Sequence, residues 1–164
     1  MEKTQQTNLA LKIGAILYLV WGMLHVWVGY DAVSVYHSAT PYKGLWEMLI
    51  GGETAPSGKF QFATNTLTQN VQINFILNFC LDVAGAGLLG ILIGLMLWRG
   101  VKPWLTYLIG FFIIGLIDLS FLTLQVLSGH IKANWETYGG PVIWFAAVVL
   151  LPFGLPKFKW KELI

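Results

Sequence analysis

Long apolar segments and short polar ones alternate along the chain. The first three apolar segments cover about residues 9–30, 71–98 and 104–128, and each reaches the roughly 20 apolar residues that a helix needs to cross a bilayer. The fourth, over about 138–155, is shorter and ends among prolines. The pattern predicts an all-α integral membrane protein with a bundle of four transmembrane helices. We expect a single domain over residues 1–164, with a long outer loop between the first two helices.

The composition agrees with a membrane location. Apolar residues make up 56% of the 164 residues and charged residues only 11%, whereas a soluble domain carries about a quarter charged residues. Cys80 is the single cysteine, which excludes a disulfide within the chain and the paired thiols of a thiol–disulfide exchange enzyme. No small-residue cleavage site follows the first apolar segment, so we expect it to be kept as a helix. We predict no metal site and no cofactor.

Positive charges are divided unevenly between the two ends of the predicted bundle. The amino terminus, the short second connection and the carboxyl tail carry seven of the ten basic residues: Lys3, Lys12, Arg99, Lys102, Lys157, Lys159 and Lys161. The positive-inside rule then places both termini in the cytoplasm and residues 31–69 outside. We expect this membrane to be the cell membrane, or the endoplasmic reticulum if the protein is eukaryotic. A basic tail is usual after a last helix, so we expect no nucleic-acid partner.

The bundle is predicted to be closed at the cytoplasmic end and wider outside. Small residues at four-residue spacing in the second apolar segment favour close helix contact: Ala86, Gly90 and Gly94. The outer loop contains an amphipathic stretch near residues 43–50. We expect a short helix there, with its Trp46, Met48 and Leu49 side resting on the membrane or on the mouth of the bundle.

Polar residues recur at every fourth position in the outer half of the second apolar segment: Asn70, Asn74, Asn78 and Asp82. On an α-helix this spacing forms one slightly slanted stripe. Asp82 and Asp118 each lie about ten residues from the outer end of their helix. Because an α-helix rises about 1.5 Å per residue, both carboxyl groups lie near the middle of the bilayer. Placing a charge at that depth costs about 2.5–3.5 kcal/mol on translocon-insertion scales, so a carboxylate there indicates a function.

Polar residues on three predicted helices point to one outward-opening cavity. The expected lining consists of His25, Asn78, Asp82, Asp118 and Gln125. The structural alternative is that the asparagines only join helices, a contact worth about 0.6–2 kcal/mol, and that His25 satisfies a neighbouring group.

Several short motifs occur in an order that resembles the EXPERA family of emopamil-binding sterol isomerases and sigma-2-type receptors. They are "WGMLHVWVG" with His25, "YKGLWEMLIGG" in the outer loop, "NFCLDVAG" with Asp82, "GLIDLSFLTLQ" with Asp118, and "PVIWFAAVVLLPFG" at the end. The chain has Gly29 where the isomerases carry an acid. The resemblance implies a four-helix membrane fold and a site for sterol-like or cationic amphiphilic ligands.

The leading functional hypothesis is a site for a lipophilic sterol-, isoprenoid- or amine-like ligand, which could act as an acid/base double-bond isomerase. Such an enzyme needs one group that protonates carbon and another that removes a proton, and two carboxyls in one dry cavity tend to differ in protonation. Asp82 and Asp118 are the candidate catalytic pair, with His25 as a proton relay. Expected ligand-binding residues are Asn74, Asn78, Gln125, Trp21 and Trp144, with Trp27 as a further aromatic wall.

Other functions fit the same residues. Mid-membrane carboxylates also serve proton or cation transporters and channel subunits, although the inner half of the bundle offers no polar residue to continue a path. A haem cytochrome would need His25 and a second axial histidine. In a structural subunit of a membrane complex, the buried acids would only pair with neighbouring polar groups, and the outer loop would be the functional part. We expect a membrane lipid or lipophilic small molecule as partner, and a homo-oligomer remains an open alternative.

Overall fold

The computed structural model describes residues 2–49, 63–158 and 160, and all regular secondary structure within them is helical. The long helices α1 (Glu2–Tyr36) and α3 (Thr66–Trp98) come first, with the short helix α2 (Pro41–Leu49) between them. The final long helix, α6 (Trp135–Leu150), continues into the 3₁₀ turn η4 (Leu151–Phe153).

The third long element is built from four consecutive helical pieces. These are α4 (Pro103–Ile109), the π-helical η2 (Gly110–Ile114), α5 (Gly115–Phe121) and the π-helical η3 (Leu122–Val126). The wider turn at the end of η3 is closed by a bond from the Leu127 N–H to the Leu122 carbonyl, five residues back, at 2.8 Å. Two π segments therefore enclose the α-helical piece that carries Asp118.

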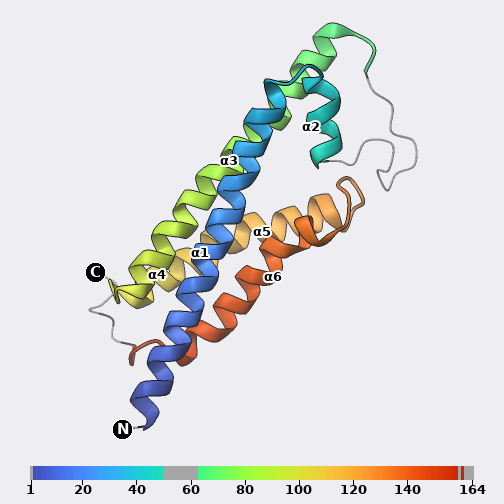
Figure 1. The fold of residues 1–164 in the computed structure, drawn as a ribbon. Coiled ribbons are helices and arrows are strands. Elements are labelled where there is room, and N and C mark those ends of the chain that lie inside the picture. The colour runs from blue at the N-terminus through green and yellow to red at the C-terminus, as the bar shows by residue number, and fades with distance from the viewer. Residues whose placement is uncertain (1, 50–62, 159, 161–164) are drawn as a thin grey trace.

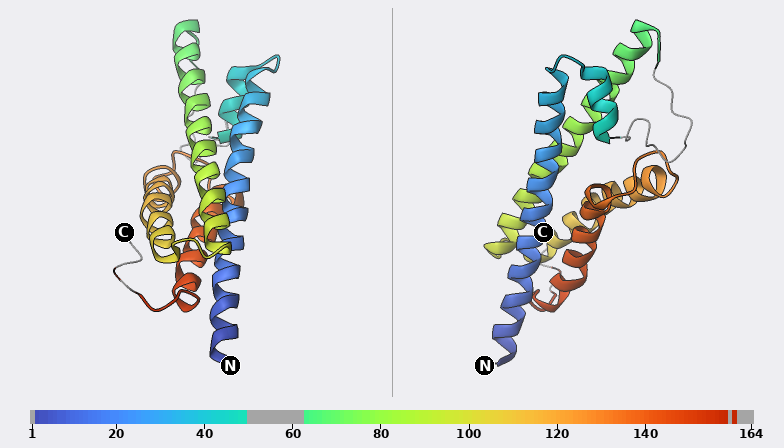
Figure 2. Two further views of the ribbon diagram at one scale, coloured as in Figure 1. Left: turned by 90° about the vertical axis from the view of Figure 1, so that its left-hand side faces the viewer. Right: turned by 45° about the vertical axis from the view of Figure 1, so that its right-hand side comes forward.

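Figures 1 and 2 show how the helices are arranged. α1 and α3 lie side by side, and α2 folds back beside their ends (Figure 1). α4, α5 and α6 pack near the other end of this pair, and the connection between α5 and α6 diverges from the ends that carry α2 (Figure 2). We call the end with α2 the loop end, and the end with the N-terminus and residues 99–102 the terminal end.

Local signals fix where the helices begin. The side chain of Asn65 caps α3 by accepting the Thr68 N–H at 3.1 Å. Asn134 and Thr137 form a reciprocal capping box at the start of α6, which satisfies backbone N–H groups that have no partner within the helix. α3 and α4 are joined by a tight turn in which Gly100 has φ of 67°, a conformation that glycine adopts without steric cost.

Glycines bring the backbones of α1 and α3 into direct contact. A Cβ atom added at Gly22 would lie 2.5 Å from the Gly87 carbonyl oxygen, and one added at Gly87 would lie 2.7 Å from the Gly22 carbonyl oxygen. Further along α3, Gly90 faces Trp21, and Gly94 faces Leu19. The close contact expected from the small residues of the second apolar segment is thus present, and α1 is its partner.

Two groups of buried apolar side chains hold the fold together, one toward each end. The terminal-end group consists of Ala15, Tyr18, Trp21, Ile93, Leu97, Ile114, Trp144, Ala147, Val148 and Leu151. The loop-end group consists of Ala32, Leu45, Ile73, Ile76 and Cys80. The first joins α1, α3, η2, α6 and η4, whereas the second joins only α1, α2 and α3, so the loop end of the bundle has fewer helices packed together.

The all-helical fold and its four long apolar helices are confirmed for the described residues. The helices long and apolar enough to cross a membrane are Leu9–Tyr36, Thr66–Trp98, Pro103–Val126 and Trp135–Phe153. The expected loop over residues 31–69 is partly helical, because α1 continues to Tyr36 and α3 begins at Thr66. Residues 50–62 of that loop lie outside the described residues.

The short outer helix is present as α2. Leu45 is buried, and Trp46, Met48 and Leu49 pack around the loop-end group. The side that we expected on the membrane or the bundle mouth therefore rests on α1 and α3. Tyr42 helps to hold α2 there, since its hydroxyl donates to Gln72 Oε1 at 2.6 Å.

Cys80 is fully buried in the loop-end group. A buried unpaired thiol behaves as a small apolar side chain. We therefore expect Cys80→Ala and Cys80→Ser to keep the fold, with a change in unfolding free energy below about 1.5 kcal/mol. Thermal unfolding of the purified variants in detergent measures this, and loss of folded protein in both variants would contradict it.

Candidate functional site

A buried polar cluster lies where α1, α5 and α6 meet. The indole N–H of Trp21 donates to Asp118 Oδ2 at 2.8 Å, and both residues are buried, with Asp118 only 2% exposed. The second carboxyl oxygen, Oδ1, lies 3.9 Å from His25 Nε2. Trp21, His25 and Asp118, expected from the sequence to serve a common cavity, are thus brought together.

The bond between the His25 ring and its own helix determines how the ring faces Asp118. His25 Nδ1 lies 2.7 Å from the Trp21 carbonyl oxygen, and the ring stacks on the Trp21 indole with centroids 3.7 Å apart. A carbonyl oxygen can only accept, so Nδ1 carries the hydrogen of this bond. In the neutral ring Nε2 is then an acceptor, and it faces another acceptor, Asp118 Oδ1, at a distance too long for a hydrogen bond.

Gly140 of α6 faces both of these acceptor atoms. A Cβ added there would lie 3.1 Å from His25 Nε2, 3.3 Å from Asp118 Oδ1 and 2.9 Å from His25 Cε1. The absent side chain therefore lets α6 approach His25 and Asp118 closely, and a side chain at this point would press on both residues.

A methyl group at this point should disturb the cluster. We expect Gly140→Ala to displace the His25 ring and to remove any ligand held between His25 and Asp118. Gly139→Ala is the matched control, because a Cβ at Gly139 meets only Trp135 Cε2 at 3.9 Å. The readout is the NMR signal of the His25 ring in ¹⁵N-histidine-labelled protein: it should shift in Gly140→Ala and stay in Gly139→Ala. Equal spectra for both variants would contradict the proposed contact.

The cluster is open on the side of His25 and closed on the other. The His25 side chain is 15% exposed, whereas that of Asp118 is 3% exposed. Two turns from His25 toward the terminal end on α1, Tyr18 is fully buried in the terminal-end group. His25 is therefore the more accessible member of the pair, and the Asp118 carboxylate is the more enclosed.

The backbone around Asp118 is irregular on both sides. η2 and η3 enclose the seven residues of α5, and π segments in helices are frequently found at functional sites. Trp144 supports η2 from α6: its indole N–H donates to the Gly110 carbonyl oxygen at 3.2 Å, and Gly115 lies against its ring. Trp144, expected as a ligand-binding wall, is a 5% exposed member of the terminal-end group.

Asp82 lies on a different face from the one expected. It is exposed, and its carboxylate accepts the Asn78 side-chain N–H at 2.9 Å. Cys80, Ala84 and Gly87 contact α1, and at 100° per residue Asp82 lies on the opposite side of α3 from them. Within the described residues Asp118 bonds Trp21 and approaches His25, and no contact joins it to Asp82. The expected acid pair is replaced by one acid beside one histidine.

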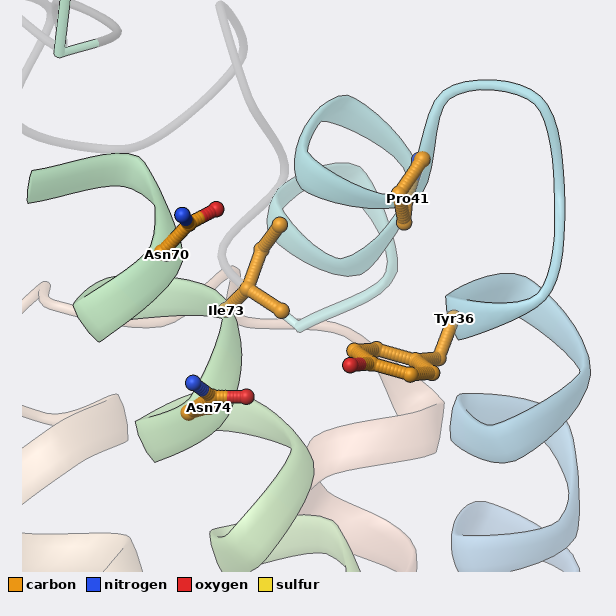
Figure 3. Close-up of a pocket in the computed structure, with 5 residues that line it drawn as sticks. All are labelled: Tyr36, Pro41, Asn70, Ile73 and Asn74. Atoms are coloured by element: carbon orange, nitrogen blue, oxygen red, sulfur yellow. The ribbon is translucent and has the colours of Figure 1, made fainter. Parts of the chain in front are cut away.

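The remaining predicted lining residues are dispersed. Asn74 lines a pocket of about 450 Å³ at the loop end, together with Tyr36, Pro41, Asn70 and Ile73 (Figure 3). Asn78 is exposed beside Asp82, and Trp27 is also exposed. Gln125 is half-buried in η3, where its backbone carbonyl accepts the N–H groups of His130 and Ile131.

Two features of the cluster were not predicted from the sequence. Trp21 was expected as an aromatic ligand-binding wall, but its N–H also donates a hydrogen bond to Asp118. Gly140 was not considered at all. Its only sequence signal is the pair Gly139–Gly140 inside an otherwise bulky helix, which indicates a close approach of another group.

Comparison with known proteins assigns no function to this chain, so its function is inferred from its residues. The chain matches no family model, and no curated protein or solved structure is detectably similar to it. Among the described residues, no group of three His, Cys, Asp or Glu side chains could hold a metal ion.

Proposed function

We propose that the chain is an integral membrane protein that binds a lipophilic molecule through a polar group held between His25 and Asp118. Membrane insertion is supported by the four long apolar helices and by their large exposed apolar side chains, among them Phe75, Phe112, Leu116 and Phe145. So much exposed apolar surface is unusual for a protein in water. The basic residues of the terminal end support placing both termini in the cytoplasm.

One observation carries the ligand proposal. Two acceptor atoms, His25 Nε2 and Asp118 Oδ1, face each other at 3.9 Å inside the bundle with Gly140 beside them. Buried polar groups in proteins are nearly always hydrogen-bonded. No donor from the described residues bonds either atom, and a ligand N–H or O–H between them would supply one.

The chemistry of the cluster favours a lipophilic amine over a neutral lipid. A charged carboxylate in the interior is stable only with a compensating charge or several hydrogen bonds, and an ammonium group supplies both. The stacked rings of Trp21 and His25 add an aromatic surface, to which cations are attracted. The EXPERA-like motifs suggest the same ligand classes, namely sterol-like lipids and cationic amphiphiles.

The same cluster could support acid/base chemistry. In this extension of the proposal, His25 and Asp118 exchange protons with the carbon atoms of a bound isoprenoid-like lipid, and Asp82 has no part. Double-bond migration needs one group to add a proton and another to remove one, both within reach of the substrate. Two groups 3.9 Å apart are close enough to share that task.

Transport is less well supported than binding. On the terminal side of Asp118, the buried polar side-chain groups among the described residues are the hydroxyls of Tyr18 and Thr106 and the indole N–H groups of Trp21 and Trp144. The Thr106 hydroxyl donates to the Val101 carbonyl oxygen. Both N–H groups already donate within the protein. A cation moving past Asp118 toward the terminal end would find few groups to replace its water.

A set of matched ligands tests the proposal in the purified wild-type protein. A rigid lipophilic tertiary amine, its quaternary ammonium analogue and a neutral ether of the same skeleton are compared by thermal unfolding in a non-ionic detergent. The tertiary ammonium has an N–H, the quaternary ion has charge alone, and the ether has neither. Ligand at about 100 times its Kd stabilises a protein by about 2.7 kcal/mol, so the tertiary amine should clearly raise the Tm. Equal effects of all three compounds, or none from any, would contradict the proposal.

A further inference from the structure

The exposed polar face of α3 is the part of the molecule that the proposed ligand site leaves unexplained. Five exposed residues follow one another along this face at alternating steps of four and three residues: Val71, Phe75, Asn78, Asp82 and Gly85. That spacing forms a seam along one side of a helix, as in paired helices. In a membrane, an uncovered amide and carboxylate on such a seam would face lipid at high cost.

The surface of this seam contains an open, shallow hollow. Val71, Asn74, Phe75 and Asn78 line a hollow of about 290 Å³. They occupy positions i, i+3, i+4 and i+7, which are the four positions that surround an inserted side chain when two helices pack.

We propose that α3 pairs in parallel and in register with α3 of a second copy of this chain. In such a pair, Phe75 of the other copy enters the hollow. In a parallel, in-register pair, a side chain at this seam position inserts between four residues of the facing helix, and one of these four is the equivalent residue of that helix. Phe75 is 73% exposed and free to do so. Two copies inserted with the same orientation are related by an axis along the membrane normal, so equal depths meet.

Asn78 and Asp82 are complementary across this pair. One N–H of the Asn78 amide donates to Asp82 Oδ2 at 2.9 Å. An amide has two N–H groups and a carboxylate has two oxygens, so each copy retains one donor and one acceptor for which the described residues provide no partner. Across the two-fold axis, the remaining N–H of each copy can bond the anionic oxygen of the other, and such charge-assisted bonds are among the stronger ones.

A second copy fits this face better than a lipid chain does. An acyl chain offers neither donor nor acceptor at the depth of Asp82, whereas a helix with the same residues offers both. Gly85 adds room for close approach at the next seam position, because a Cβ built there meets no atom within 4 Å.

Disulfide cross-linking in membranes tests the pairing, starting from a Cys80→Ala protein that has no other cysteine. Val71→Cys and Gly85→Cys leave Phe75, Asn78 and Asp82 in place and should each give a covalent dimer on mild oxidation. Leu116→Cys on α5 is the control, because Leu116 is also 73% exposed but lies off the seam. Failure of both seam cysteines to cross-link, or equally fast cross-linking of Leu116→Cys, would overturn the proposal.

A second variant separates specific pairing from random collision. Phe75→Ala, combined with Gly85→Cys, should slow the cross-linking several-fold while the monomer melts at an unchanged temperature, since Phe75 contributes little to the core. An unchanged cross-linking rate would overturn the in-register arrangement. Asp118→Asn combined with Gly85→Cys should still cross-link, because the pairing does not depend on the ligand site.

Discussion

Asp118→Ala should destabilise the fold by about 1–3 kcal/mol, the usual effect of leaving a buried hydrogen-bonding group without its partner. The group left behind is the indole N–H of Trp21, which donates to Asp118 Oδ2 at 2.8 Å in a fully buried position. Asp118→Asn should be milder, because the amide oxygen can still accept this bond. The measurement is the unfolding free energy in detergent with increasing denaturant.

The exposed acid provides the control for this prediction. Among the described residues, Asp82 accepts only the side-chain N–H of Asn78, on the surface of α3. Asp82→Ala should therefore leave the stability of the monomer nearly unchanged. An effect of Asp82→Ala as large as that of Asp118→Ala would mean that the two acids contribute alike. The assignment of the buried site to Asp118 would then be wrong.

Gly87→Ala should force the two long helices α1 and α3 apart and destabilise the fold. The added Cβ would lie 2.7 Å from the Gly22 carbonyl oxygen, 2.8 Å from the Val26 nitrogen and 3.0 Å from His25 Cβ. Two of these are backbone atoms, which cannot move without separating α1 from α3. Overpacking of this kind typically costs about 1–3 kcal/mol, and the shift of α1 would also move His25 away from Asp118.

Gly139→Ala is again the matched control, since its added methyl group makes only an ordinary contact, with Trp135 Cε2 at 3.9 Å. Both substitutions gain up to about 1 kcal/mol of helix propensity, so Gly139→Ala should be neutral or slightly stabilising. A lower Tm for Gly87→Ala alone, with weaker ligand binding, is the expected result. Equal Tm values for the two variants would contradict the close backbone contact.

The helical architecture could be predicted from the sequence because it depends on the length and spacing of apolar residues. Four apolar segments and the tight turn after Trp98 are local features, and they appear as expected. The α2 helix was found in the same way. The bounds of α1 and α3 were set too narrow, because polar residues such as Gln69 and Asp31 continue these helices beyond the apolar stretch.

The composition of the site could be predicted only in part. His25 and Asp118 were identified because charged or titratable groups at that depth are costly, and the structure brings them together. The partner of Asp118 could not be identified from the sequence. The position of a residue along its helix gives its depth in the membrane, but it does not show which neighbouring helix the residue faces. Asp82 has the expected depth but points away from α1. Gly140 matters because it has no side chain, which lets α6 approach His25 and Asp118, and sequence patterns of polar residues do not reveal such a position.

Equilibrium binding of the tertiary amine to wild type, Asp118→Asn and Asp82→Asn tests the central claim most directly. In Asp118→Asn the amide oxygen keeps the Trp21 bond and the amide N–H₂ turns toward His25 Nε2, so the two facing acceptors are lost. We expect the Kd to rise at least about tenfold, or 1.4 kcal/mol, in Asp118→Asn, and to stay unchanged in Asp82→Asn. Wild-type affinity in Asp118→Asn, or an equal loss in Asp82→Asn, would contradict the claim.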